Sequence, residues 1–387
     1  MAQNTVFSQI IKLIPRTQFE SIVYKHNADK KVRTLNCWTW FGSLLFGQLT
    51  GHNSIRAIER VFSHNDANFK KLGFGSVKKS TLADANKVRS TEIFEDLFSY
   101  LLKKAERVSP KKNGFRFKGQ VLALDSSSIE LSLKLCPWAK VFEHSSTMKL
   151  HTAIDVANYL PEIVVLSKGR LNDLSVAKEF FQFPKGTTVL MDRGYLGYEW
   201  MNQLNKEGVF FVTRSRDCFK FKVAKSNKVD RTRGHICDQV VYPKHGRGKV
   251  KRKQFKGKLR RISFRDPDTK KKLVFLTNRF DLATQTICDL YKARWKVELF
   301  FKSLKQNLKI KKFLGNTANA VKAQIWVAII AYLLIQILRY SHKVTISIPD
   351  TMAVISVLLL LKEPLSRVLR DVPCVRRHPP PLQLTLF

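Results

Sequence analysis

The sequence has few acidic residues for its length. Thirty Asp and Glu stand against 69 Lys and Arg among 387 residues, which leaves a net charge of +39 at pH 7. Self-repulsion on this scale destabilises a compact chain unless a polyanion neutralises it. Each neutralised phosphate releases counterions and adds affinity that does not depend on base sequence, so the shortage of acids predicts a nucleic-acid partner.

The sequence also lacks paired cysteines, an expected signal peptide and an apolar run of membrane length. The six cysteines are scattered without a CxxC pair, and His235 with Cys237 has no second ligand pair at zinc spacing. Reduced thiols in a cytoplasm are therefore expected. The apolar stretch 323–338 is shorter than the roughly 20 residues that cross a bilayer, so we expect a buried core helix and no membrane partner.

The pattern of apolar residues along the chain changes near residue 117. Before it, apolar residues at three- and four-residue spacing predict helices. After it, strands alternate with helices, which predicts an α/β layer with a mixed sheet. The expected strands are 121–131, 150–158, 162–167, 187–192, 209–213 and 272–278.

Residues 214–272 differ again, because 22 Lys and Arg face only five acids there. Short alternating runs and Gly and Pro residues predict a β-rich insertion. Such a segment is either a solvated face or a surface that follows a phosphate backbone, and its charge density favours the second reading. The expected DNA contacts within it are Lys249, Lys251, Arg252 and Lys253.

Two aspartates, Asp125 and Asp192, are each expected at the C-terminal end of an apolar strand. That edge is where ligands and catalytic groups collect in α/β sheets. A single Asp at such a place usually caps a turn. Two of them with a later carboxylate could hold Mg²⁺ or Mn²⁺, which prefer oxygen ligands.

The third carboxylate is expected on a helix spanning 289–308. At 100° per residue, Tyr291, Arg294, Glu298 and Lys305 share an arc of about 60° beside an apolar face. The alternative is an exposed amphipathic helix with an i,i+4 pair between Arg294 and Glu298. The helix alone does not separate these readings.

The four residues on this arc match Y-x2-R-x3-E-x6-K, and with them the sequence resembles the insertion-sequence transposases with a DDE triad, in the subgroup called the insertion sequence 4 family. Asp192 followed by Arg-Gly-Tyr, and Asp125 in ALDSSSIEL, also resemble that family. Lys149, His151, Asn172 and Asp173 match weaker features of it. The resemblance covers roughly residues 117–340.

This resemblance implies a ribonuclease-H-like catalytic domain with a β-rich insertion, preceded by a helical domain. The implied boundaries are a helical DNA-binding domain in 1–115, a catalytic domain in 116–345 with its insertion at about 214–272, and a C-terminal helix and tail in 346–387. Asp125, Asp192 and Glu298 would be the catalytic and metal-binding residues, and Tyr291, Arg294 and Lys305 would handle DNA phosphates.

The implied reaction is cleavage of transposon ends and their joining to target DNA. Two Mg²⁺ or Mn²⁺ ions would activate the attacking oxygen and stabilise the leaving oxygen. The implied partners are double-stranded DNA, as terminal inverted repeats and target, and a second copy of the chain in a synaptic homodimer. The implied location is a prokaryotic cytoplasm, associated with the nucleoid when bound to DNA.

Other carboxylates and other functions remain open. Asp155 is the strongest rival for a triad position, whereas Asp173 opens a helix and is expected to be a cap or turn residue. The alternatives are a ribonuclease-H-like nuclease or resolvase without strand transfer, and a non-catalytic nucleic-acid-binding protein.

Overall fold

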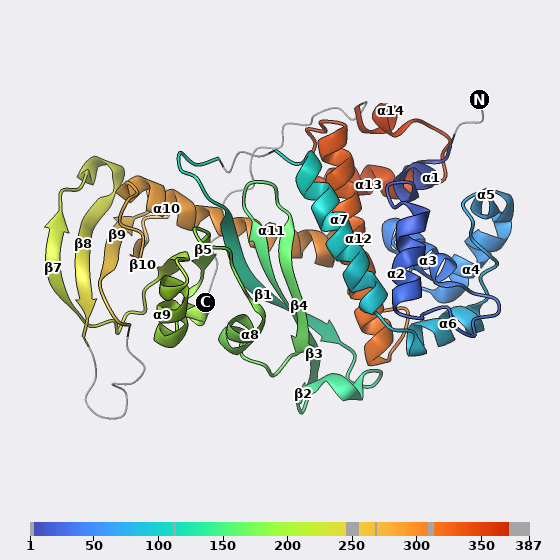
Figure 1. Ribbon diagram of the computed structural model, residues 1–387, viewed down its shortest axis with the longest axis horizontal. Helices are drawn as coiled ribbons and strands as arrows, with labels where there is room; N and C mark the ends of the chain where they lie inside the picture. Colours follow the sequence, from blue (N-terminus) through green and yellow to red (C-terminus); the bar gives the residue numbers. More distant parts are fainter. Residues whose placement is uncertain (1–3, 111–113, 245–254, 268, 309–312, 371–387) are drawn as a thin grey trace. The chain divides into compact units, whose positions relative to one another are not determined.

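The computed structural model of the chain describes residues 4–110, 114–244, 255–267, 269–308 and 313–370 (Figure 1). The chain divides into two compact units. Of the described residues, the first unit comprises those within 4–110, 128–148 and 300–370, and the second comprises those within 114–127 and 149–299. Segments far apart in sequence therefore share each unit.

The first unit is mainly helical. Two of its N-terminal helices begin at a polar side chain that caps them: Thr5 accepts the N–H of Ser8, and Asn36 accepts the N–H of Thr39. The N-terminal helices are α1 (Val6–Ile11), α2 (Arg16–Lys25), α3 (Cys37–Thr50), α4 (Ile55–His64), α5 (Asp66–Lys70), α6 (Lys79–Val88) and α7 (Glu92–Val108). The later helices are α12 (Ala318–Ser341), α13 (Ile348–Leu358) and α14 (Leu365–Arg370).

Helix α12 is the core of the first unit. It is long and apolar enough to span a membrane, yet 94% of its most apolar window is buried within the structure. It packs against α3 and α7, and α7 runs beside it in Figure 1. The expected buried core helix at 323–338 is therefore confirmed, because packing against other helices removes its apolar surface from water.

The second unit is built on a mixed sheet. Its strands are β1 (Val121–Leu131), β3 (Ser145–Asp155), β4 (Pro161–Lys168), β5 (Thr188–Met191), β6 (Phe210–Arg214), β7 (Phe221–Asn227), β8 (His235–Pro243), β9 (Leu259–Arg265) and β10 (Lys272–Thr277). The order is β3-β1-β5-β6-β10-β9-β8-β7, with β4 beside β3. The short strand β2 (Lys140–Phe142), which belongs to the first unit, pairs antiparallel with the start of β3.

Parallel pairing brings strand ends to one edge of this sheet. Strand β5 runs parallel to β1 on one side and to β6 on the other, with Met191 opposite Thr213. Helices α8 (Asp173–Phe180) and α9 (Tyr198–Lys206) bury Ala177, Trp200 and Met201 in the same core as the strands. The observed class is the expected mixed α/β fold.

Strand β1 departs from the expectation at Asp125. The strand has the expected bounds, 121–131, but Asp125 lies inside it and not at its C-terminal end, where this residue was expected. Pairing with β5 extends only from Val121 to Ala123, so Asp125 lies just past the parallel ladder. The last residues of this strand, 128–131, belong to the first unit.

Residues 214–272, expected to be β-rich, contain the antiparallel strands β7, β8 and β9. A buried ion pair joins two of them: Arg260 on β9 bonds Asp238 on β8 at 2.6 Å, with side chains 6% and 1% exposed. Thr284, the first residue of α10 (Thr284–Ala293), also donates to Asp238 at 2.7 Å. Burial raises the pKa of Asp238, but the bonds from Arg260 and Thr284 outweigh burial and lower that pKa.

We expect Asp238→Ala to lower the free energy of unfolding by about 3–5 kcal/mol, because it leaves the Arg260 guanidinium buried without its counterion. Chemical denaturation followed by circular dichroism measures this loss. The control is Asp66→Ala, which removes an exposed i,i+4 pair with Lys70 and should cost less than about 1 kcal/mol. Equal losses in the two variants would show that the buried pair holds the insertion no better than a surface pair does.

Candidate active site

Asp192 is held directly after β5. It caps the short 3₁₀ helix η2 (Arg193–Tyr195), and its Oδ1 accepts the N–H of Gly194 at 2.7 Å. A Cβ at position 194 would lie 2.9 Å from that oxygen, so glycine permits the close approach. An Asp side chain that accepts the backbone N–H of the residue two positions later forms an Asx turn, and this turn fixes the direction of the carboxylate.

Asp125 lies in a more enclosed place. Its side chain is 25% exposed, and its Oδ1 accepts the N–H of Ser126 at 2.8 Å. Burial is the main cause that raises its pKa to about 6, and the Asp192 and Glu298 carboxylates raise it further. The Arg294 guanidinium and the Ser126 N–H act in the opposite direction.

Arg294 joins Asp125 to Glu298. Its Nη2 donates to Glu298 Oε1 at 2.6 Å, and its Nη1 lies 3.4 Å from Asp125 Oδ2. Burial alone would lower the pKa of this guanidinium, but the phenol and two carboxylates around it outweigh burial and raise that pKa. The guanidinium therefore stays charged and offsets the repulsion between two carboxylates 173 residues apart.

The helix that carries Arg294 and Glu298 is not regular. A continuous helix from 289 to 308 was expected, but α10 ends at Ala293 and α11 (Trp295–Lys302) begins after Arg294. A π-helical turn then spans Ser303–Asn307. The expected arc assumed 100° per residue throughout, and the π-helical turn that contains Lys305 departs from that spacing.

Tyr291 remains close to Arg294. The guanidinium lies 5.9 Å from the centre of the Tyr291 ring, which packs at 4.7 Å against Phe275 on β10. Burial raises the pKa of the Tyr291 phenol, and Arg294 lowers it. Three of the four expected signature residues thus gather with the two aspartates.

The rival carboxylate Asp155 has a local role. It ends β3 and accepts hydrogen bonds from Ala157 N at 2.7 Å and from Gln120 Nε2 at 3.3 Å. These contacts hold the turn before β4, where Tyr159 adopts a positive φ of 56°. Asp173, expected as a cap, occupies the first turn of α8, while Asn172 is the capping residue. Asp173 also pairs with Lys149 at 3.0 Å.

The charges of the site suit a divalent cation, although the side chains are not yet arranged around one. Three carboxylates act on each other here, and burial penalises the charged form of Asp125. A cation would relieve that penalty, as Arg294 now does. Within the described ranges, no group of three His, Cys, Asp or Glu side chains is arranged to hold one metal ion.

Two backbone donors at this site were not anticipated from the sequence. The N–H groups of Ser126 and Gly194 orient Asp125 and Asp192. The signal for Gly194 was present, because glycine two residues after Asp is typical of tight Asx turns. Ser126 carried no comparable signal.

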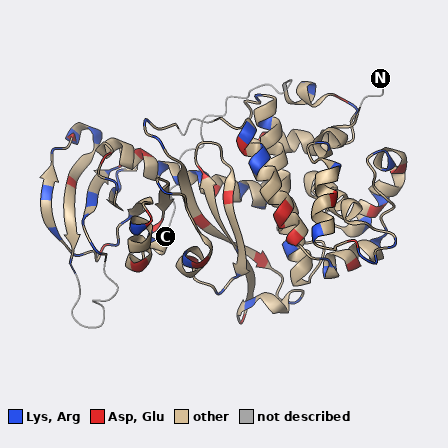
Figure 2. Cartoon of the chain, viewed as in Figure 1, with Lys and Arg blue, Asp and Glu red and all other residues tan. Residues whose placement is uncertain are grey.

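The insertion presents cations on its outer strand. Lys222 and Lys225 on β7 are exposed, and blue segments mark β7 and β9 in Figure 2. The expected DNA contacts Lys249, Lys251, Arg252 and Lys253 lie outside the described residues.

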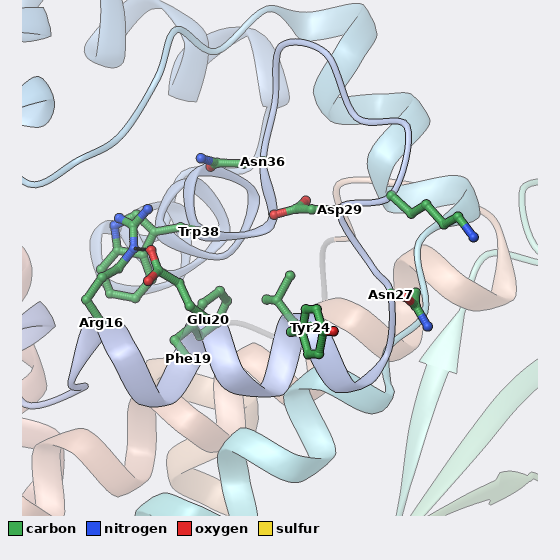
Figure 3. Close-up of a pocket in the computed structure, with 10 residues that line it drawn as sticks. Arg16, Phe19, Glu20, Tyr24, Asn27, Asp29, Asn36 and Trp38 are labelled. Carbon is green, nitrogen blue, oxygen red and sulfur yellow. Dashed lines mark hydrogen bonds and ion pairs between the residues drawn. The ribbon is translucent and has the colours of Figure 1, made fainter.

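A separate cavity of about 350 Å³ lies in the first unit, between α2 and the start of α3 (Figure 3). Arg16 stacks over the Trp38 ring at 4.7 Å and pairs with Glu20 at 2.7 Å, so its charge is already compensated. The lining also includes Phe19, Tyr24, Asp29 and Lys30. None of these residues belongs to the carboxylate site of the second unit.

We expect Asp125→Asn to stabilise the metal-free protein at pH 7.5 relative to the wild type, and to do so less at pH 4.5. The folded pKa of about 6 lies above the usual 3.8, so wild-type stability falls as the pH rises through this window. The full effect is at most about 3 kcal/mol. Thermal unfolding of the variant and the wild type in a metal chelator, at both pH values, measures this difference in stability. A difference that does not change with pH would contradict the raised pKa of Asp125.

Comparisons with known proteins show the family to which the chain belongs. Residues 116–334 match the family described as Transposase DDE domain, and residues 2–75 match a domain of unknown function, DUF4372. A putative transposase of Sinorhizobium fredii is 30% identical over 77% of this chain and 80% of its own length.

Two further relatives are transposases for insertion sequence elements. The one described as probable, from Geobacillus stearothermophilus, is 28% identical over 66% of each chain. The one described as putative, from Synechocystis, is 26% identical over 70% of this chain and 75% of its own. A solved piggyBac transposase synaptic complex with hairpin DNA has a TM-score of 0.41 at 12% identity, covering 96% of this chain and 81% of that chain, which is too low to support an argument about fold.

The matched DDE domain implies a ribonuclease-H-like fold for the sheet that carries Asp125 and Asp192, and it covers more than half of the 387 residues. The chain belongs to the DDE transposase family, a family of DNA-processing enzymes.

Proposed function

We propose that the protein cuts the ends of a bacterial insertion sequence and joins them to target DNA, with Asp125, Asp192 and Glu298 as its catalytic carboxylates. The observation that carries the proposal is electrostatic. Asp192 and Glu298 both raise the pKa of Asp125, so three carboxylates from distant parts of the chain act on one another. Such crowding is unfavourable in a resting protein and is typical of functional sites.

The proposal includes Mg²⁺ or Mn²⁺ as the cofactor, with two ions held by the same three carboxylates. When bound, such ions activate the attacking oxygen and stabilise the leaving 3′-oxygen. The protein's own part is to orient the carboxylates, through the Ser126 and Gly194 N–H groups, and to keep Arg294 within reach.

Tyr291, Arg294 and Lys305 are proposed to contact DNA phosphates, as in the insertion sequence 4 subgroup that the signature resembles. Arg294 would exchange its carboxylate contacts for two phosphate oxygens, since a guanidinium can bind both at once. Lys305 would act as a point charge. We further propose a homodimer at the paired ends, in a cytoplasm, with the net charge of +39 providing general affinity for DNA.

The relatives favour a transposase over a nuclease without strand transfer, and over a non-catalytic binding protein. An assay with Mg²⁺ and a duplex carrying the inverted repeats that flank the gene separates all three. A transposase nicks the repeat end and joins it to a second duplex. A nuclease only nicks, and a binding protein does neither.

We expect Asp192→Asn to reduce cleavage at least about 10³-fold, because a catalytic carboxylate group acts as a unit. Its affinity for the repeat duplex should be retained, since the variant loses a negative charge and keeps every cation. The matched control is Asp155→Asn, which alters a carboxylate with a local structural role. Should Asp192→Asn lose binding in step with cleavage, the residue would be structural.

We expect Lys222→Ala with Lys225→Ala to weaken DNA binding at every sequence and to flatten its salt dependence. Each lost phosphate contact removes about 0.9 from the log–log slope, so the pair should remove about 1.8. The matched control is Lys185→Ala with Lys206→Ala. These two exposed lysines lie just before the N-terminal ends of β5 and β6. Binding isotherms at several salt concentrations measure the slopes, and equal slopes in the two variants would exclude a DNA-tracking role for β7.

A further inference from the structure

The cavity of the first unit has an exposed aromatic ring in its lining. Tyr24 on α2 lines this space of about 350 Å³, and the residue is 85% exposed. Among the described residues, no other large apolar side chain is exposed to this extent. A single exposed ring on a convex surface needs no explanation, but a ring beside a cavity can stack on a ligand that enters it.

A regular spacing on α2 puts three of the lining side chains in one row. Arg16, Glu20 and Tyr24 follow one another at intervals of four residues, so they lie along the same face of the helix. Trp38, near the start of α3, lies under Arg16 at 4.7 Å. Figure 3 shows Arg16, Glu20 and Trp38 together at one end of the row and Tyr24 at the other. The cavity therefore presents a stacked guanidinium and a phenol ring, two kinds of flat group on which nucleobases stack.

The polar side chains of the lining already have partners. Both oxygens of Asp29 accept the N–H of Cys37, at 2.8 and 3.1 Å. Asn36 caps α3, and Trp38 Nε1 donates to the Leu72 carbonyl at 2.9 Å. These bonds fix the walls before any ligand binds, as in most small-molecule sites. They leave mainly flat surface for a ligand, which favours a planar molecule over a small polar one.

The loop between α2 and α3 adds positive charge. Lys30 lines the cavity, and Lys30, Lys31 and Arg33 are all exposed. None of the three pairs with an acid in the part of the chain that the structure describes. Such cations bind phosphates and release the counterions condensed on them, which is the main source of general affinity for nucleic acid. Flat groups beside cations match a nucleotide, which combines a planar base with a charged phosphate.

The same loop holds two residues in the left-handed region of backbone conformation. Asn27, which lines the cavity, has a φ of 48°, and Lys31 has a φ of 67°. Asparagine tolerates this conformation, whereas lysine adopts it at a cost in free energy. The N–H of Ala28 bonds the Val23 carbonyl at 3.0 Å, which ties the loop to α2. Backbone strain that the surrounding structure maintains is common at ligand-binding sites.

We propose that this cavity binds one unpaired base of DNA, which stacks on Tyr24 while Lys30, Lys31 and Arg33 bind the neighbouring phosphates. A base paired within a duplex is not free to enter a cavity, so the site selects a nucleotide that lies outside the stack. A protein segment in the same cavity would cover the rings but would leave the three cations without a partner. The inference goes beyond the proposed function, since it gives the first unit a binding site of its own.

The test measures the affinity of the full chain for two duplexes of the flanking inverted repeat, with a metal chelator present so that neither is cut. One duplex is fully paired and the other carries a single bulged adenine, since an already unpaired base costs least to extrude. We expect the wild type to bind the bulged duplex about 5–150-fold more tightly, the fold-change that stacking of one base on an aromatic ring produces. Tyr24→Ala should lose this preference, and Tyr24→Phe should keep it because the ring remains.

The control Phe180→Ala removes an exposed aromatic ring of the second unit and should keep the preference for the bulged duplex. Lys30→Ala with Arg33→Ala should lower the log–log salt slope for the bulged duplex by about 1.8, whereas Tyr24→Ala should leave that slope unchanged. An unchanged slope in the double variant would overturn the assigned phosphate contacts.

Two results would overturn the inference alone: equal affinity of the wild type for both duplexes, or an unchanged preference in Tyr24→Ala. Loss of the preference in Tyr24→Phe would overturn the stacking role of the ring. Binding to neither duplex would overturn the inference together with the proposed function.

Discussion

The contact of Arg294 with Glu298 and Asp125 is the interaction on which the candidate site depends. Half-buried carboxylates repel one another and lose hydration, so a group of them is stable only with positive charge among them. Arg294 supplies that charge from the break between α10 and α11. From there, one side chain reaches Glu298 one helical turn along and Asp125 on β1.

The rest of the second unit holds this contact in place. Parallel pairing of β5 with β1 and β6 aligns the strands that carry Asp125 and Asp192. The buried bonds of Asp238 with Arg260 and Thr284 fasten the first turn of α10 to the insertion strands. Residues between the second aspartate and the glutamate therefore provide cationic surface and also support the helix that leads to Arg294.

The distribution of charge sets this site apart from the rest of the chain. A protein with a net charge of +39 attracts phosphates over much of its surface, which gives affinity but no chemistry. The acidic group at the sheet edge is small against this background, and Arg294 partly masks it. Metal ions and a DNA phosphate would take over the two roles that Arg294 now combines, neutralising carboxylates and supplying positive charge.

The sequence by itself determined the kinds of residue and much of the local structure. The strands expected at 187–192 and 209–213 and the buried helix expected at 323–338 follow from short-range patterns. The choice of Asp125, Asp192 and Glu298 as candidates follows from these patterns and a family signature. Only the tertiary structure decided that Asp125 lies inside its strand, that the signature helix is interrupted at Arg294, and that Arg294 contacts both Asp125 and Glu298. Burial and electrostatic interaction depend on neighbours brought together from distant parts of the chain, and no local pattern in a sequence records those neighbours.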